Sequence, residues 1–198
     1  MPTSFSKLLT YSSNPPSPPF SKRGGWGVIP VEKEGDVTME LEKTIGNLLR
    51  KKGWTLSIAE SCTGGLICDR ITNVSGSSDY FMGGMVTYSN ESKAEHLGVS
   101  LVEIRRYGAV SSQVAGKMAQ GVRKAFGTTF GLSTTGVAGP TGGTKRSPVG
   151  RVFIGISDVK RTWVKRLDLE GSRREIKKKA AEEALQIFYE RLIHSRHS

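Results

Sequence analysis

The segment 59–65, AESCTGG, constrains the fold of this chain more than any other stretch. An apolar run, Trp54 to Ile58, precedes it, and a run with helical apolar periodicity, Leu66 to Val74, follows it. This order predicts a strand, a tight polar turn and a helix. Such a turn can lift the Ser61 hydroxyl out of a sheet edge and leave free N–H groups of the helix start around it. The segment is therefore expected to hold either a nucleophile or an anion.

The rest of the chain alternates strands with helices and then closes with a hairpin and a long helix. Helices are predicted at 39–52, 65–72, 90–97, 112–126 and 174–192, and strands at 54–58, 83–89, 130–134, 150–156 and 162–169. The last two strands are joined by a hairpin turn at 158–160. This pattern is typical of an α/β layered fold with a mixed sheet in a single domain.

The N-terminal residues differ in composition from the rest of the chain of 198 residues. Residues 1–38 are rich in Pro, Gly and Ser and cannot bury a core, so we expect a disordered tail before a domain at 39–198. The tail is either a Pro-rich partner-binding segment or translated upstream sequence, with Met39 as the natural start. No apolar run approaches the ~18 residues needed to span a bilayer, so no membrane association is expected.

The net charge of +11 favours anionic partners, either a nucleic acid or a phosphorylated small molecule. The densest basic patch lies at 173–179, and a solvated helix face explains it equally well. Cys62 and Cys68 stand six residues apart without a Cys-x-x-Cys spacing, so neither a disulfide nor a zinc site is expected, and free thiols fit a reducing cytoplasm. The three histidines are scattered and do not indicate a metal site.

Three further segments carry candidate chemistry. The loop Gly136–Gly143 follows a strand but matches neither the P-loop nor the GxGxxG spacing. It is either a flexible turn or a place where backbone approaches a ligand beside Thr135. Lys93 follows Tyr88 by about one helical turn. It is either a solvated lysine or a base for a serine, which requires a lowered ammonium pKa.

The segment 171–177 begins the last helix with two arginines. A guanidinium fork beside helix N–H groups suits a phosphate, and a surface charge run is the alternative.

Taken together, these segments resemble the C-terminal domain of the CinA competence/damage-inducible family, whose stand-alone form is a nicotinamide-nucleotide amidohydrolase (nicotinamide mononucleotide deamidase). The resemblance covers about residues 40–193. The motifs that carry it are 59–65 (AESCTGG), 76–78 (GSS), 86–90 (VTYSN) with Lys93, 97–99 (LGV), 108–111 (GAVS), 135–143 (TGVAGPTGG) and 148–150 (PVG). The chain departs from the family pattern at Ser147, Ser172 and Lys177.

The resemblance implies a three-layer α/β/α sandwich, a homodimer and hydrolysis of the carboxamide of nicotinamide mononucleotide to nicotinate mononucleotide and ammonia. It implies that Ser61 is the nucleophile, Lys93 its general base and Tyr88 an orienting residue. Substrate contacts and the oxyanion hole are implied for Thr63, Gly64, Thr135, Gly136, Gly139 and Gly143, and phosphate binding for Arg173 and Lys177. It implies neither a metal nor an organic cofactor.

Two other functions remain compatible with the sequence. One is a non-catalytic nucleotide-binding or competence-associated accessory protein. The other is an amidohydrolase that acts on a different amide. Nucleic acid is not expected as the partner. The presence of both Ser61 and Lys93 favours the enzyme over the binding protein.

Overall fold

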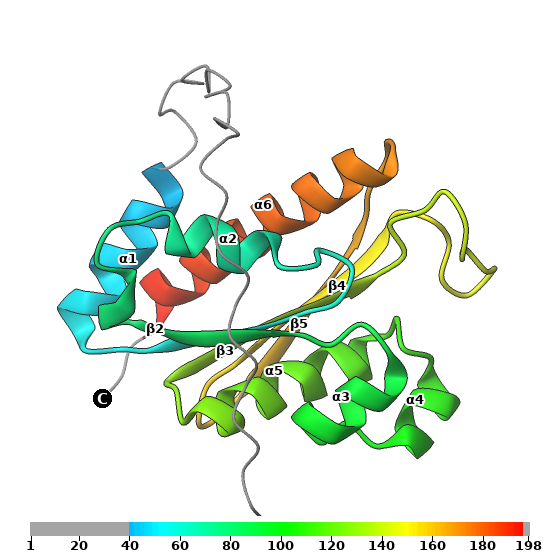
Figure 1. The fold of residues 1–198 in the computed structure, drawn as a ribbon, viewed down its shortest axis with the longest axis horizontal. Helices are drawn as coiled ribbons and strands as arrows, with labels where there is room; N and C mark the ends of the chain where they lie inside the picture. Colours follow the sequence, from blue (N-terminus) through cyan, green and yellow to red (C-terminus); the bar gives the residue numbers. More distant parts are fainter. Residues whose placement is uncertain (1–39, 196–198) are drawn as a thin grey trace, which may run out of the picture. The chain divides into compact units, whose positions relative to one another are not determined.

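A computed structural model of the chain describes residues 40–195, which form one α/β domain (Figure 1). The expectation of a disordered tail at 1–38 falls outside the described residues. The strands are β1 (Leu56–Glu60), β2 (Phe81–Val86), β3 (Phe130–Gly136), β4 (Arg151–Ser157) and β5 (Thr162–Asp168). The helices are α1 (Glu40–Lys52), α2 (Leu66–Thr72), α3 (Asn90–Leu97), α4 (Leu101–Tyr107), α5 (Ser112–Phe126) and α6 (Arg173–His194), with a short 3-10 turn at Ser77–Asp79.

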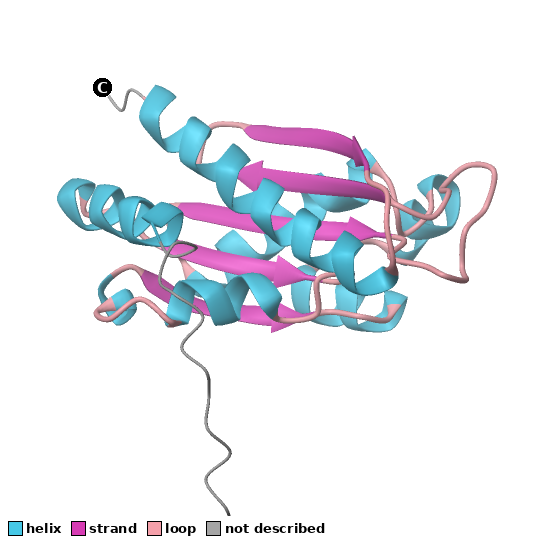
Figure 2. Cartoon of the chain, turned by 90° about the horizontal axis from the view of Figure 1, so that it is seen from above, coloured by secondary structure: helices cyan, strands magenta, loops and turns pink. Residues whose placement is uncertain are grey.

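The five strands form one mixed sheet in the order β2-β1-β3-β4-β5 (Figure 2). β1 pairs in parallel with both β2 and β3, whereas β4 pairs antiparallel with β3 and with β5. Every residue of the central strand β1 is buried, as expected for a parallel strand covered on both faces. The mixed sheet predicted from the sequence is confirmed.

Helices cover both faces of the sheet: α1, α2 and α6 lie on one, and α3, α4 and α5 on the other (Figure 1). Between the sheet and the first group, Leu49, Leu132 and Phe188 belong to a large buried apolar cluster. On the opposite face, Met118 and Val122 of α5 belong to a second cluster. Each fully buried side chain of this kind contributes about 1.5–3 kcal/mol relative to an exposed one. The three-layer α/β/α architecture is confirmed.

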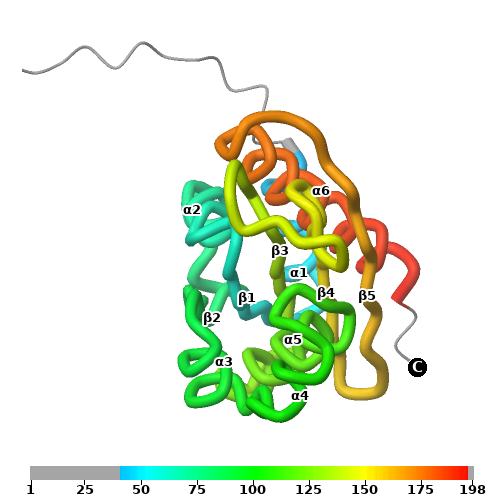
Figure 3. The backbone as a smooth tube through the Cα atoms, turned by 90° about the vertical axis from the view of Figure 1, so that its right-hand side faces the viewer, coloured from blue at the N-terminus to red at the C-terminus, as the bar shows by residue number. Residues whose placement is uncertain are grey.

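The connections on either side of β1 create a crevice at the carboxyl ends of the parallel strands. β1 leads into α2 on one face, while β2 leads into α3 on the other (Figure 3). Where neighbouring parallel strands send their connections to opposite faces, the loops separate and leave room for a ligand. The fold therefore places the residues just after Glu60 and Val86 beside this crevice.

The fold differs from the sequence prediction at strand ends and in one helix. β1 spans Leu56–Glu60 rather than 54–58, so Ala59 and Glu60 belong to the strand and not to the turn. β2 ends at Val86, three residues earlier than expected, because the carbonyls of Thr87 and Tyr88 turn away to a lysine side chain. The helix α4 was not predicted. Its seven residues bury only Ile104, so its apolar periodicity is weak. Within the described residues, no helix is both long and apolar enough to cross a membrane.

Candidate active site

Ser61 lies at the rim of the sheet, directly after β1. Its backbone N–H donates a hydrogen bond of 3.0 Å to the carbonyl oxygen of Thr134, which continues the pairing of β1 with β3 by one residue. Its side chain is largely buried but lines a cleft. The sheet therefore fixes the backbone of Ser61 while its hydroxyl faces open space.

The turn after Ser61 is held by Glu60, whose side chain is completely buried. One carboxylate oxygen of Glu60 accepts the N–H groups of Gly65 (3.0 Å) and Ile67 (3.2 Å), and the other accepts that of Cys68 (2.8 Å). The expectation that the N–H groups at this helix start are free is therefore wrong, because Glu60 already occupies three of them. A buried carboxylate satisfied in this way holds the turn in place. Gly64 adopts φ +65°, which favours glycine.

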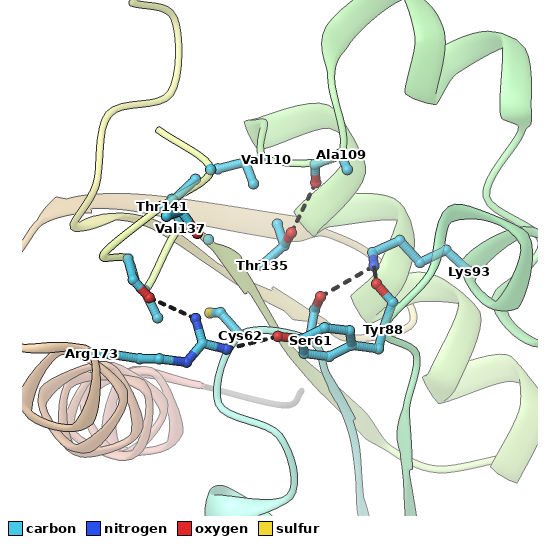
Figure 4. Close-up of a pocket in the computed structure, with 14 residues that line it drawn as sticks. Ser61, Cys62, Tyr88, Lys93, Ala109, Val110, Thr135, Val137, Thr141 and Arg173 are labelled. Atoms are coloured by element: carbon cyan, nitrogen blue, oxygen red, sulfur yellow. Dashed lines mark hydrogen bonds between the residues drawn. The ribbon is translucent and has the colours of Figure 1, made fainter. Parts of the chain in front are cut away.

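Lys93 reaches Ser61 from the neighbouring loop and helix. The hydroxyl of Ser89 accepts the N–H of Ser92 and so caps α3, which places Lys93 one turn inside the helix. The Lys93 side chain is 1% exposed, and its Nζ lies 3.1 Å from Ser61 Oγ (Figure 4). Nζ also donates to the carbonyls of Thr87 (2.7 Å) and Tyr88 (3.3 Å).

Burial lowers the pKa of the Lys93 ammonium below its ordinary value, since desolvation penalises the charged form. A neutral amine carries two N–H donors and one lone pair. In the structure Nζ donates to Ser61 Oγ and also lies 3.5 Å from a third carbonyl, that of Ser89. In the neutral form the two closest carbonyls, those of Thr87 and Tyr88, can accept the two N–H groups, and the lone pair can then accept the proton of the Ser61 hydroxyl. This arrangement can remove a proton from Ser61 without a histidine.

The cleft in front of this pair has a volume of about 240 Å³. Thr135, Gly136 and Gly139 line it, as do Ala109 and Val110 from the segment between α4 and α5. The Thr135 hydroxyl donates to the Ala109 carbonyl at 2.8 Å and ties this segment to β3 (Figure 4). Ala109 and Val110 were not predicted as site residues, since they carry no side-chain chemistry of their own.

Arg173 spans the mouth of the cleft from the first residue of α6. Its guanidinium donates to the carbonyl of Gly139 (2.7 Å) and to the hydroxyl of Tyr88 (2.9 Å) (Figure 4). Ser172, a departure from the family pattern, caps α6 and forms a reciprocal capping box with Glu175. A short polar side chain thus still anchors the helix start that presents Arg173.

The other candidate residues lie outside the residues that line this cleft. Thr63 is buried, with its hydroxyl 2.7 Å from that of Thr134. Gly143 approaches Val149. Gly64 and Lys177 line a separate hollow next to the Ser61 turn. The structure therefore brings Arg173, but not Lys177, to the cleft.

Cys62 also lines the cleft, beside Ser61. Burial raises the pKa of its thiol to about 12, so at neutral pH it stays protonated and is a poor nucleophile. Both Cys62 and Cys68 are free thiols. Among residues 40–195, no group of three or more His, Cys, Asp or Glu side chains could hold a metal ion.

Comparison with known proteins identifies the family. The family model of the CinA C-terminal domain matches residues 38–192. The chain belongs to the CinA family. Two curated relatives are a CinA-like protein of Kosmotoga olearia, 40% identical over 213 aligned residues and 94% of this chain, and a CinA-like protein of Salinibacter ruber, 54% identical over 132 residues and 67% of this chain. The chain spans only 52% and 32% of the lengths of these two CinA relatives.

Solved structures of the CinA superfamily share the fold. The competence damage-inducible protein A from Klebsiella pneumoniae aligns with a TM-score of 0.78 at 30% identity, covering 81% of this chain and all of that one. The competence/damage inducible protein CihA from Agrobacterium tumefaciens aligns with a TM-score of 0.76 at 34% identity, covering 79% and 95%.

Proposed function

We propose that this CinA domain hydrolyses the carboxamide of nicotinamide mononucleotide, giving nicotinate mononucleotide and ammonia, with Ser61 as nucleophile and Lys93 as general base. The observation that carries the proposal is the 3.1 Å contact between Ser61 Oγ and the buried Lys93 Nζ at a cleft. Burying a lysine amine costs free energy, and a lysine without a functional role would remain in solvent. The burial of Lys93 against a serine hydroxyl therefore supports a catalytic role.

The proposed reaction proceeds in two stages. Lys93 takes the Ser61 proton as Oγ attacks the carboxamide carbon, and the tetrahedral intermediate carries its charge on the former carbonyl oxygen. The protonated Lys93 then gives its proton to the departing nitrogen, so ammonia leaves and an ester remains on Ser61. Water, deprotonated by Lys93, attacks this ester. The protonated Lys93 then returns the proton to Ser61 Oγ as the ester bond breaks, and the nicotinate carboxylate is released.

Stabilisation of the intermediate is assigned to backbone N–H groups just after Ser61. Glu60 occupies the N–H groups of Gly65, Ile67 and Cys68. Thr63 and Gly64 line the separate hollow, so the candidate in the turn that also lines the cleft is the N–H of Cys62. Removing one such donor from a comparable site costs about 10²–10³ in kcat.

Arg173 is assigned the role of binding the 5′-phosphate of the substrate. Its contacts with Gly139 and Tyr88 hold the guanidinium at the mouth of the cleft, and a guanidinium carries five N–H donors, more than these two contacts use. Tyr88 is then a positioning residue that keeps Arg173 in place. A homodimer remains an expectation from the family.

The experiment that tests this function is ammonia release from the purified protein. Nicotinamide mononucleotide, nicotinamide riboside and free nicotinamide are offered in parallel, with the Ser61→Ala variant as the control. We expect Ser61-dependent turnover that is fastest on the nucleotide. Turnover of another amide alone would indicate a different amidohydrolase. Binding of the nucleotide without release of ammonia would indicate a nucleotide-binding module.

A further inference from the structure

A second hollow lies next to the turn that carries Ser61, outside the cleft. It has a volume of about 410 Å³, and its floor includes Gly64 and Gly65. One wall is formed by Arg174, Lys177 and Lys178 of α6, which packs beside α2 on the same face of the sheet (Figure 1).

The hollow has an excess of positive charge. Its three cations face a single carboxylate, that of Asp69, which gives a surplus of two positive charges. Asp69 itself accepts a hydrogen bond of 3.4 Å from Asn73. Within residues 40–195, none of Arg174, Lys177 and Lys178 forms an ion pair. A ligand with two negative charges would balance this surplus.

The position of these cations on α6 is unfavourable for the helix alone. They lie in its first two turns, where the macrodipole is positive and acidic residues are preferred. Arg174 and Lys178 are also like charges four residues apart, a spacing that destabilises a helix. Glu175, the acidic residue of the first turn, accepts hydrogen bonds from the backbone N–H and the hydroxyl of Ser172 in the helix cap. When several cations occupy positions that lower the stability of one helix end, a functional role for them is indicated.

The hollow also allows a ligand to come close to the backbone of the turn at Gly64. Lys177 Nζ would lie 3.3 Å from a Cβ atom on Gly64, so the amine rests directly over a glycine of the turn. A ligand held by Lys177 would therefore contact the same turn that positions Ser61, at residues that do not line the cleft.

We propose that this hollow is a second binding site, separate from the cleft, for a phosphate group. A phosphate dianion matches the charge surplus, and its oxygens accept the donors of one arginine and two lysines. The site does not depend on the assignment of the cleft as an amidase.

The experiment is a titration with inorganic phosphate and with pyrophosphate at constant ionic strength. It follows the backbone amide signals of Gly64 and Gly65 by NMR and Kd by calorimetry. Wild type is compared with Arg174→Gln/Lys178→Gln. The matched control is Lys117→Gln/Lys165→Gln, which removes two exposed cations elsewhere. We expect saturable shifts in wild type and in the control, and Kd weaker by at least about tenfold in Arg174→Gln/Lys178→Gln, the effect of losing ~1.4 kcal/mol of binding.

Folding provides an independent check on this variant. Without ligand, Arg174→Gln/Lys178→Gln is expected to melt at the same or a higher temperature than wild type, because it removes cations from the positive end of α6. The proposal is overturned if wild type shows no saturable shifts, or if the control weakens Kd as much as the hollow variant. Displacement of inorganic phosphate from the hollow by nicotinamide riboside, which carries no phosphate, would show that the hollow and cleft are one site, and would also overturn the proposal.

Discussion

Lys93 combines two properties that rarely occur together in a lysine. Its side chain is buried, and its amine is held by backbone carbonyls and a serine hydroxyl rather than by a carboxylate. Burial favours the neutral amine, and the neutral amine is the form that accepts a proton. The chemistry of the site therefore depends on a protonation state that the position of one residue sets.

The first prediction concerns pH. The pKa of Lys93 is lowered from its ordinary 10.5 by burial, and only the unprotonated amine is a base. As pH rises through this lowered pKa, kcat/KM on nicotinamide mononucleotide should increase and then level off below pH 10.5. Below the lowered pKa the amine is charged and the rate should fall tenfold per pH unit. A profile that rises only near the pKa of an exposed lysine would contradict the assignment.

The second prediction concerns Ser61 and Lys93 acting together. Ser61→Ala and Lys93→Ala should each remove most of kcat, and the double variant should be little worse than either single one, since residues that act as one unit are not additive. Steady-state ammonia release measures this, with circular dichroism as the control for folding. Multiplicative losses in the double variant would indicate two independent roles.

The third prediction concerns Arg173. Arg173→Ala should weaken the transition-state binding of the nucleotide by ~1.5–3 kcal/mol, the range for a hydrogen bond to a charged group. Hydrolysis of nicotinamide riboside, which lacks the phosphate, should hardly change. The ratio of the two kcat/KM values is the measurement, with Arg105→Ala, an exposed arginine outside the cleft and the hollow, as the control. An unchanged ratio would remove Arg173 from phosphate binding.

At the scale of elements, the turn between β1 and α2 depends on Glu60 rather than on its glycines alone. We expect Glu60→Gln to lower the free energy of unfolding by about 2–3 kcal/mol, because a neutral amide offers one acceptor where the carboxylate satisfies three N–H groups. Urea denaturation measures the loss. Glu183→Gln on the exposed face of α6 is the control and should change stability by no more than ~0.5 kcal/mol.

The sequence was most informative where local pattern and fold agree. The strand, turn and helix around Ser61 follow from apolar periodicity and glycines, and so does the pairing of alternating elements into a mixed sheet. Sequence alone could not show that Glu60 folds back onto α2, because that contact depends on a turn whose path is set by φ at Gly64 and Gly65. The separation of Arg173 from Lys177 was equally hidden, since residues four apart on a helix share a face but can reach different hollows.

At the scale of the whole molecule, the residues from α1 onward form buried apolar clusters on both faces of the sheet. Residues 1–38 are rich in Pro, Gly and Ser, a composition that does not form a core. We therefore expect a chain that begins at Met39 to keep the melting temperature and the activity of the full chain. Differential scanning calorimetry and ammonia release check this, with the full chain measured alongside. A drop in either would show that the N-terminal residues contribute to the domain.

The position of α6 along the chain affects how the protein is made on the ribosome. α6 follows every strand in sequence, yet Leu185 and Phe188 cover the central strands, and Arg173 closes the mouth of the cleft. During synthesis the sheet therefore emerges with one apolar face covered only by α1 and α2, a state prone to aggregation until the last helix is made. Ser61 and Lys93 are made well before Arg173, so the nascent chain carries the proposed nucleophile and base before Arg173 can close the cleft.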